Sequence, residues 1–219
     1  FGDTTQLSAF NSFDFGDSQF IDVTERTTLR LDHQFFWGSD GLRFDASALV
    51  SWTAPGNELE PLGIGGLQNA FTLGLCYPVV RSRRLSVWLS AGAEWDDNTV
   101  DVSNGAVTVT DDSLRVGVIG GRLERQDRFG TTSLDMSVRQ GVDLFNATSD
   151  NDVNKSRADG SAVFTSVRGE VSRDLALSEL SASINEGFSL HGRGKFQWTN
   201  DPVLSYEEFH IGGDFVRGY

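Results

Sequence analysis

Apolar and polar residues alternate with a period of two along most of this sequence, the pattern of β-strands whose two faces meet different surroundings. The clearest stretch runs from Leu42 to Trp52, where apolar residues hold the even positions and mostly polar residues hold the odd ones. Similar alternation covers 67–77, 85–95, 131–139 and 187–198, and weaker alternation covers 4–14, 27–37, 113–125 and 162–173. No segment has a convincing helical period. The pattern therefore predicts an all-β chain of about nine strands.

The predicted strands are about 10–13 residues long, roughly twice the ~5–6 residues usual in globular sheets. A tilted strand that crosses a bilayer needs about 9–11 residues. The connections expected between them alternate between short ones at 38–41, 79–83 and 126–130 and long polar ones at 15–25, 53–65, 96–112 and 142–160. The segment 174–186 is an exception, because it is long where a short turn is expected. Tight turns at one end and long loops at the other predict an antiparallel up-and-down transmembrane β-barrel rather than a soluble β-sandwich.

The composition excludes several other classes of protein. The hydrophobic fraction is 38%, and no stretch approaches the ~18 consecutive apolar residues of a membrane helix. With 18 Lys+Arg against 31 Asp+Glu the formal charge is -13, so we expect no nucleic-acid partner, which would require a basic face. The single cysteine, Cys76, excludes an internal disulfide framework and a cysteine-rich zinc site.

Residues that commonly carry chemistry show no catalytic or metal-binding spacing. His33, His191 and His210 are scattered over different segments. The stretch 150–154 begins like a calcium loop, but Lys155 stands where that template needs glycine. No nucleophile elbow or phosphate-binding glycine loop stands out. We therefore expect no enzyme activity, no metal and no cofactor.

The two faces of the predicted strands carry different residues. Aromatic residues near the strand ends are expected to form the two interfacial girdles of a barrel, and they are Trp37, Trp52, Tyr77, Trp95 and Trp198. Charged residues on the polar face would point into the lumen and form a hydrated wall of mixed charge, suited to a polypeptide that passes in an extended form. These candidate lumen-facing residues are Arg43, Asp45, Glu94, Asp135, Arg139, Arg193 and Lys195. The same wall would also suit a passive porin.

The end of the sequence carries the most specific motif. Residues 201–219 read DPVLSYEEFHIGGDFVRGY and resemble the sixth extracellular loop of the BamA-like outer-membrane insertase and transporter superfamily, with its GG…VRG(F/Y) signature. Within that superfamily the chain resembles the two-partner secretion transporters (TpsB), the ShlB/FhaC/HecB type of haemolysin secretion and activation proteins. The stretches 36–44, 73–85 and 207–213 support this narrower resemblance. Only Asp214 and Phe215 separate the two glycines from Val-Arg-Gly, where about three residues are usual, so the loop tip is expected to differ slightly in shape.

This resemblance implies a sixteen-stranded barrel, of which the chain would supply about nine strands, the third to the eleventh. Residues 1–219 would then be part of one transmembrane β-barrel domain ending in the VRGY loop, a fragment without the periplasmic POTRA domains and the last barrel strands. The implied function is export of a large exoprotein, a haemolysin or adhesin, across the bacterial outer membrane. Its expected partners are the N-terminal secretion domain of that exoprotein and the outer-membrane lipids. The alternatives are a BamA/TamA-like insertase of barrel proteins, a passive porin or a soluble β-rich adhesin.

The loop motif is the site to which the resemblance points. Its residues are Gly212, Gly213, Val216, Arg217, Gly218 and Tyr219. Glycines can adopt positive φ angles and allow close backbone packing, and Arg217 can hold a carboxylate with two hydrogen bonds. In the family this loop folds back into the barrel, where its arginine meets an acidic residue on a later strand. The motif is therefore expected to hold the barrel in a translocation-competent state, with the acidic partner lying beyond Tyr219.

Overall fold

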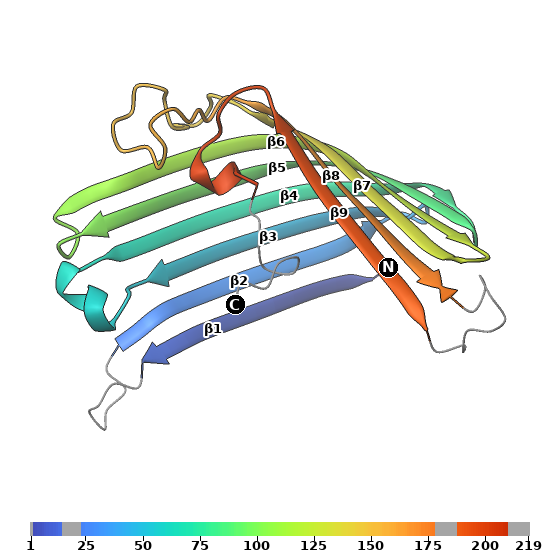
Figure 1. Cartoon of the computed structure of the whole chain (residues 1–219), viewed down its shortest axis with the longest axis horizontal. Helices are drawn as coiled ribbons and strands as arrows, with labels where there is room; N and C mark the ends of the chain where they lie inside the picture. The colour runs from blue at the N-terminus through green and yellow to red at the C-terminus, as the bar shows by residue number, and fades with distance from the viewer. Residues whose placement is uncertain (1, 15–22, 178–187, 210–219) are drawn as a thin grey trace.

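The computed structural model describes residues 2–14, 23–177 and 188–209. They form one nine-stranded antiparallel sheet in which each strand pairs with its neighbours in sequence, in the order β1 to β9 (Figure 1). The strands are β1 (Asp3–Asp14), β2 (Val23–Trp37), β3 (Leu42–Thr53), β4 (Gly65–Arg81), β5 (Leu85–Val102), β6 (Val107–Asp127), β7 (Gly130–Gly141), β8 (Thr165–Ala176) and β9 (Ser189–Thr199). Two short 3-10 helices, η1 (Asn57–Leu62) and η3 (Ser205–Glu207), lie in connections. The predicted all-β up-and-down fold is confirmed.

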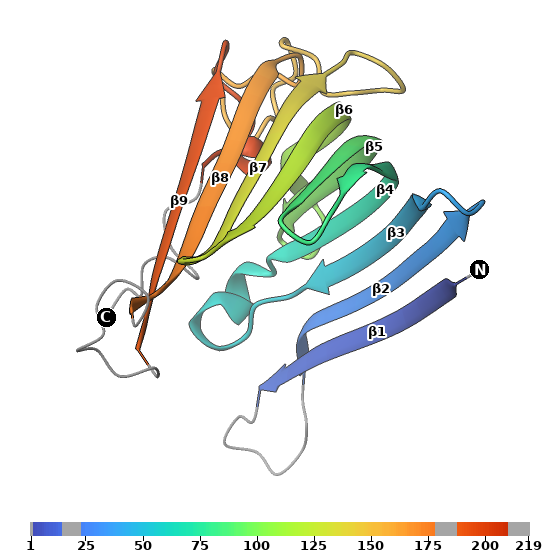
Figure 2. The same cartoon turned by 90° about the vertical axis from the view of Figure 1, so that its right-hand side faces the viewer.

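The sheet curves into an open trough. β1 and β9 are its two edge strands and lie on opposite sides of the trough, so the sheet does not close within the described residues (Figure 2). In the same part of the chain, no helix has the length and apolar character needed to cross a membrane.

The strand register sorts the side chains onto the two faces of this trough. Phe44 of β3 lies between Phe35 of β2 and Leu75 of β4, and the Phe35 and Phe44 rings stack with their centroids 4.7 Å apart. Because side chains alternate along a strand, the convex face collects the apolar residues and leaves them open, for example Ile119 at 70% exposure and Leu73 at 49%. A whole sheet face of exposed large apolar side chains is what contact with lipid requires.

One connection is much shorter than the sequence pattern predicted. β5 continues to Val102 and β6 begins at Val107, so the tight turn Ser103–Ala106 replaces the long loop expected over 96–112. The prediction was wrong because the apolar residues of the convex face end at Trp95, while the backbone pairing of β5 with β6 continues to the pair Val102–Val107. Side-chain hydrogen bonds add to this pairing, as where Thr108 donates to the carboxylate of Asp101 at 2.7 Å.

The remaining described connections follow the predicted alternation. Short turns at 38–41, 82–84 and 128–129 lie at one end of the sheet, and the long connections 54–64, 142–164 and 200–209 lie at the other. Figure 1 shows η1 close to the β5–β6 turn, and the backbone N–H of Ser103 donates to the Leu62 carbonyl at 2.9 Å. We refer to these two ends as the turn end and the loop end.

The buried core lies at the loop end rather than along the sheet. It consists of Leu114, Val116, Ala147, Ala162, Phe164, Val203 and Leu204. β6 extends past β7, whose pairing stops at the pair Val116–Gly141, and the 142–164 loop covers the edge of β6 that β7 leaves open. The backbone N–H of Thr148 donates to the Ser113 carbonyl at 2.9 Å. The loop thus satisfies backbone groups that would otherwise be an unpaired strand edge.

Candidate functional site: a buried charge cluster at the base of a loop

Four charged side chains meet on the concave face, three from strands of the sheet and one from the segment 200–209 that lies over it. Glu207, at the end of η3, lies between two arginines, with its carboxylate 2.6 Å from Arg139 of β7 and 2.5 Å from Arg168 of β8. Arg139 also holds Glu94 of β5 with two hydrogen bonds of 2.9 and 2.7 Å. We call these four residues the charge cluster. The charge cluster connects β5, β7 and β8 to the segment 200–209, which follows β9 and is not part of the sheet.

The register explains why these strand residues can meet. Glu94 pairs with Val116 and Arg139 pairs with Val118, so their side chains lie on either side of β6. The aliphatic β6 side chains offer no competing hydrogen-bond partner, and the long arginine reaches across the strand. Arg168 occupies the same face on β8, opposite Ser137 of β7.

The centre of the cluster is shielded from water while its outer members are not. The side chains of Glu207 and Arg139 are 7% and 9% exposed, whereas those of Glu94 and Arg168 are 33% and 34% exposed. Desolvating an ion costs several kcal/mol, which is offset only where the pairing geometry is good. Arg139 meets this condition with two carboxylates, while the Nε of Arg168 is buried without a partner. Removing one carboxylate would therefore leave an arginine poorly compensated.

Backbone groups of the same segment reinforce this anchor. Arg168 donates to the carbonyl oxygen of Glu207 at 2.9 Å, and the side-chain amide of Gln197 on β9 donates to the same oxygen at 2.8 Å. Both the charge and the main chain of Glu207 are thus fixed to the sheet.

The 142–164 loop holds the other side of the segment. Arg157 of that loop forms an ion pair with Glu208 at 2.5 Å, with both side chains substantially exposed. Beneath this pair Leu204 packs in the core with Phe164, and the two side chains are 0% and 1% exposed. The segment 200–209 is therefore held by buried charges on one side and by an apolar contact and a surface pair on the other.

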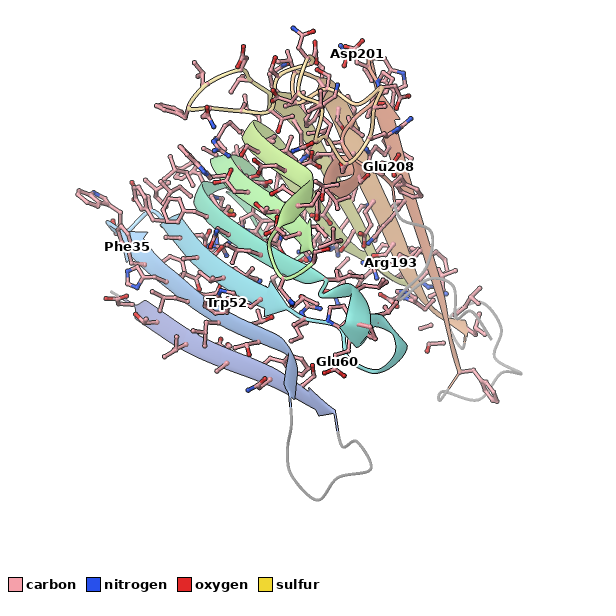
Figure 3. The ribbon with its side chains drawn as sticks, turned by 90° about the vertical axis from the view of Figure 1, so that its left-hand side faces the viewer. Phe35, Trp52, Glu60, Arg193, Asp201 and Glu208 are labelled. Carbon is pink, nitrogen blue, oxygen red and sulfur yellow. The ribbon has the colours of Figure 1, made fainter. Side chains whose placement is uncertain are left out.

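A cavity of about 1040 Å³ lies between this segment and the sheet. Residues from β3 to β9 line it, together with Tyr206, Glu208 and Phe209. Burial raises the pKa of Tyr206, and the nearby carboxylates of Asp112 and Asp96 raise it further. Its hydroxyl therefore stays protonated at neutral pH. Figure 3 shows Glu208 toward the loop end and Arg193 farther down β9.

The seven candidate lumen-facing residues lie on the concave face but do not form one site. Glu94 and Arg139 meet in the charge cluster, whereas the others pair locally: Arg43 with Asp45 at 2.9 Å, Arg193 and Lys195 with Glu170 at 2.5 and 3.2 Å, and Asp135 with Arg122 at 3.9 Å. The sequence predicted a hydrated wall of mixed charge, but the segment 200–209 covers Arg139, which is 8% exposed. The role of these residues in transport stays a prediction.

Two members of the cluster were not identified from the sequence. Arg168 lies on a strand whose alternation was weak, and no face was predicted for it. Glu207 belongs to the stretch that supported the family resemblance, but nothing in that motif indicates that its carboxylate is buried. Only the fold-back of the segment onto the concave face brings these residues together.

The remaining loop motif cannot be placed in the same way. Gly212, Gly213, Val216, Arg217, Gly218 and Tyr219 lie outside the described residues, so their role stays a prediction. Residues 201–209, which include Glu207 and Glu208, are the part of that loop stretch which the structure describes. Across residues 2–14, 23–177 and 188–209, no three His, Cys, Asp or Glu side chains gather as metal ligands.

Comparison with known proteins places this architecture. Residues 27–219 match the family model described as haemolysin secretion/activation protein ShlB/FhaC/HecB. Among solved structures, CdiB from Escherichia coli shares the fold, with a TM-score of 0.75 and 18% sequence identity over 99% of this chain. The chain spans 38% of the length of CdiB. No curated protein matches the sequence significantly. Because the family match covers most of the sequence, the chain belongs to the ShlB/FhaC/HecB family of haemolysin secretion and activation proteins, and the predicted location in the bacterial outer membrane is confirmed.

Proposed function

We propose that the chain forms part of the wall of an outer-membrane pore that exports a large exoprotein, of haemolysin or adhesin type, in two-partner secretion. Family membership supports the export of a protein. The observation that carries the proposal is the contrast between an apolar convex face and a concave face lined by charged residues. In this proposal residues 1–219 belong to one barrel domain of sixteen strands, preceded in the whole protein by POTRA domains.

The pairing of charges on the concave face supports passage of a polypeptide. Arg43 is neutralised by Asp45, and Glu170 receives both Arg193 and Lys195. A wall of ion pairs offers water and short-range polar contacts without a strong field of one sign, so a passing chain of mixed charge would not be trapped. No chemical step is needed. The partner in this proposal is the N-terminal secretion domain of the exoprotein.

The charge cluster has a mechanical part in this proposal. Glu207 fixes the start of the loop that carries Arg217, and Arg217 is proposed to pair with an acidic residue beyond Tyr219. Two anchor points, one near each end of the loop, would hold it inside the barrel, and loss of either one would let the loop move within the pore.

The test uses the full-length gene, with a deletion and the variant Arg217→Ala beside the wild type. Secretion of the neighbouring large exoprotein is measured together with the outer-membrane level and heat-modifiable migration of the barrel. Loss of secretion at a normal barrel level supports the exporter and the role of Arg217. Unchanged secretion by Arg217→Ala refutes that role, and an exoprotein that is released without the gene points to an insertase or a porin.

A further inference from the structure

A tight turn in the 142–164 loop presents two apolar side chains to the surroundings. The backbone N–H of Ala147 donates to the Leu144 carbonyl at 3.1 Å, and both central residues are left-handed, Phe145 with φ 51° and Asn146 with φ 62°. Two left-handed central residues are the pattern of a type I′ turn, which favours Gly, Asn and Asp. Asn146 fits this pattern, whereas a bulky phenylalanine with positive φ is an outlier. Phe145 and Leu144 are nevertheless 71% and 55% exposed.

This turn lies on the convex side of the sheet. The ring centroid of Phe145 is 5.5 Å from that of Trp95. Trp95 pairs with Phe71 on one neighbouring strand and with Arg115 on the other, and this register puts it on the apolar convex face. The 142–164 loop therefore packs Phe164 into the buried core and places Phe145 against Trp95 on the convex face.

Trp95 also marks the level at which the apolar band ends. The Arg115 guanidinium lies 3.7 Å from the Trp95 ring centroid and forms an ion pair with Asp97 at 2.7 Å. Toward the turn end, the same face of β5 carries Ala93, Ala91 and Leu89, whereas Asp97 is the next residue toward the loop end. Tryptophan favours the headgroup boundary of a bilayer, and the charged pair of Arg115 and Asp97 lies where the apolar residues of this face end.

We propose that the turn formed by Leu144 and Phe145 inserts into the outer leaflet at the level of Trp95 and anchors the 142–164 loop to lipid. The apolar patch that these residues form is continuous with the lipid-facing convex surface through the Trp95 ring. Contact with acyl chains would bury both side chains, and this burial would compensate the unfavourable backbone of Phe145, as strained positions persist only where their surroundings hold them.

The same loop contains a matched control, Val153, which is 94% exposed. The next residue, Asn154, accepts a backbone hydrogen bond from Asp111. Asp111 is four residues beyond Arg115 along β6, away from the apolar band, which is about 13 Å along the strand at ~3.3 Å per residue. Two apolar, exposed residues of one loop are thus assigned to different surroundings, Phe145 to lipid and Val153 to water.

The test is spin-label accessibility in the full-length protein, with its native cysteines replaced and reconstituted in phosphatidylethanolamine–phosphatidylglycerol vesicles. Single cysteines replace Phe145, Leu144, Val153 or Ile119, and heat-modifiable migration selects the folded samples. We expect labels at 145 and 144 to favour dissolved oxygen over a nickel chelate, as at 119, with nickel accessibility at least about fivefold below that at 153. Equal nickel accessibility at 145, 144 and 153 would place the turn in water and overturn the proposal. Protection at 145 and 144 from both reagents would also overturn it, because protein rather than lipid would cover them.

Discussion

Replacing Glu207 by glutamine should release the segment 200–209 from the concave face. The amide keeps the size of the side chain but removes the negative charge. Arg168 then loses its paired carboxylate, and Arg139 loses one of its two. Breaking a buried ion pair from one side costs about 3–5 kcal/mol. Arg139 keeps Glu94, and Arg168 is about one-third exposed and keeps the Glu207 carbonyl, so we expect about 2–3 kcal/mol here. That free energy corresponds to a roughly 30- to 150-fold larger population of the released segment.

The neighbouring residue provides the control for this change. Glu208→Gln removes the same charge one position along the chain, but its pair with Arg157 is exposed on both sides. Exposed ion pairs contribute about 0–1 kcal/mol. The two variants therefore have the same net charge and nearly the same sequence, and they differ in the burial of the carboxylate that is removed.

Limited proteolysis of the full-length protein in detergent micelles measures the released population, since cleavage tracks local opening when reclosing is fast. We expect cleavage within 200–209 to accelerate about 30- to 150-fold in Glu207→Gln and less than about fivefold in Glu208→Gln. In an Arg168→Gln background the effect of Glu207→Gln should shrink, because the two side chains share one interaction. Equal cleavage rates for the two glutamate variants would refute the reasoning.

Three further predictions concern the sheet and its core, and each is checked by urea denaturation of the full-length barrel. Gly130→Ala should destabilise the barrel strongly, because Gly130 has a φ of +145° and an added β-carbon would lie 1.9 Å from a backbone oxygen. Gly192→Ala is the control and should be tolerated, because no atom lies within 4 Å of the added β-carbon. Ile119→Arg on the convex face should cost about 2–4 kcal/mol, and Thr72→Arg on the concave face much less. Phe164→Ala should cost about 3–5 kcal/mol, because its buried side chain is 1% exposed; an unchanged midpoint would contradict the core assignment.

The strands and their faces could be predicted because the alternation is local. In Leu67–Tyr77 the residues on one face are apolar or aromatic except for Asn69, and pairing places these residues on the convex side. The prediction failed at 96–112, where the convex face of the strands becomes polar beyond Trp95. There the backbone pairing of β5 with β6 continues, and side-chain hydrogen bonds such as that from Thr108 to Asp101 add to it, but a pattern of hydrophobicity reports neither.

The charge cluster shows the limit of sequence reasoning more clearly. The parity of Glu94 and Arg139 placed both on the polar face, but their burial depends on a segment nearly seventy residues after Arg139 folding back over them. No local signal distinguishes the buried Glu207 from the exposed Glu208 beside it. Their difference arises from the path of the chain after β9 and from the aliphatic residues of β6 that let Arg139 reach both carboxylates.

Passage of the exoprotein along the concave face is the central claim, and site-specific photo-cross-linking in cells tests it most directly. A photoreactive residue is placed at Ser90, which lines the cavity, or at the adjacent Leu89, which is 55% exposed on the convex face. With export arrested midway, we predict a cross-link to the exoprotein from position 90 and none from position 89. No cross-link from position 90, or equal cross-links from both positions, would contradict passage along this wall.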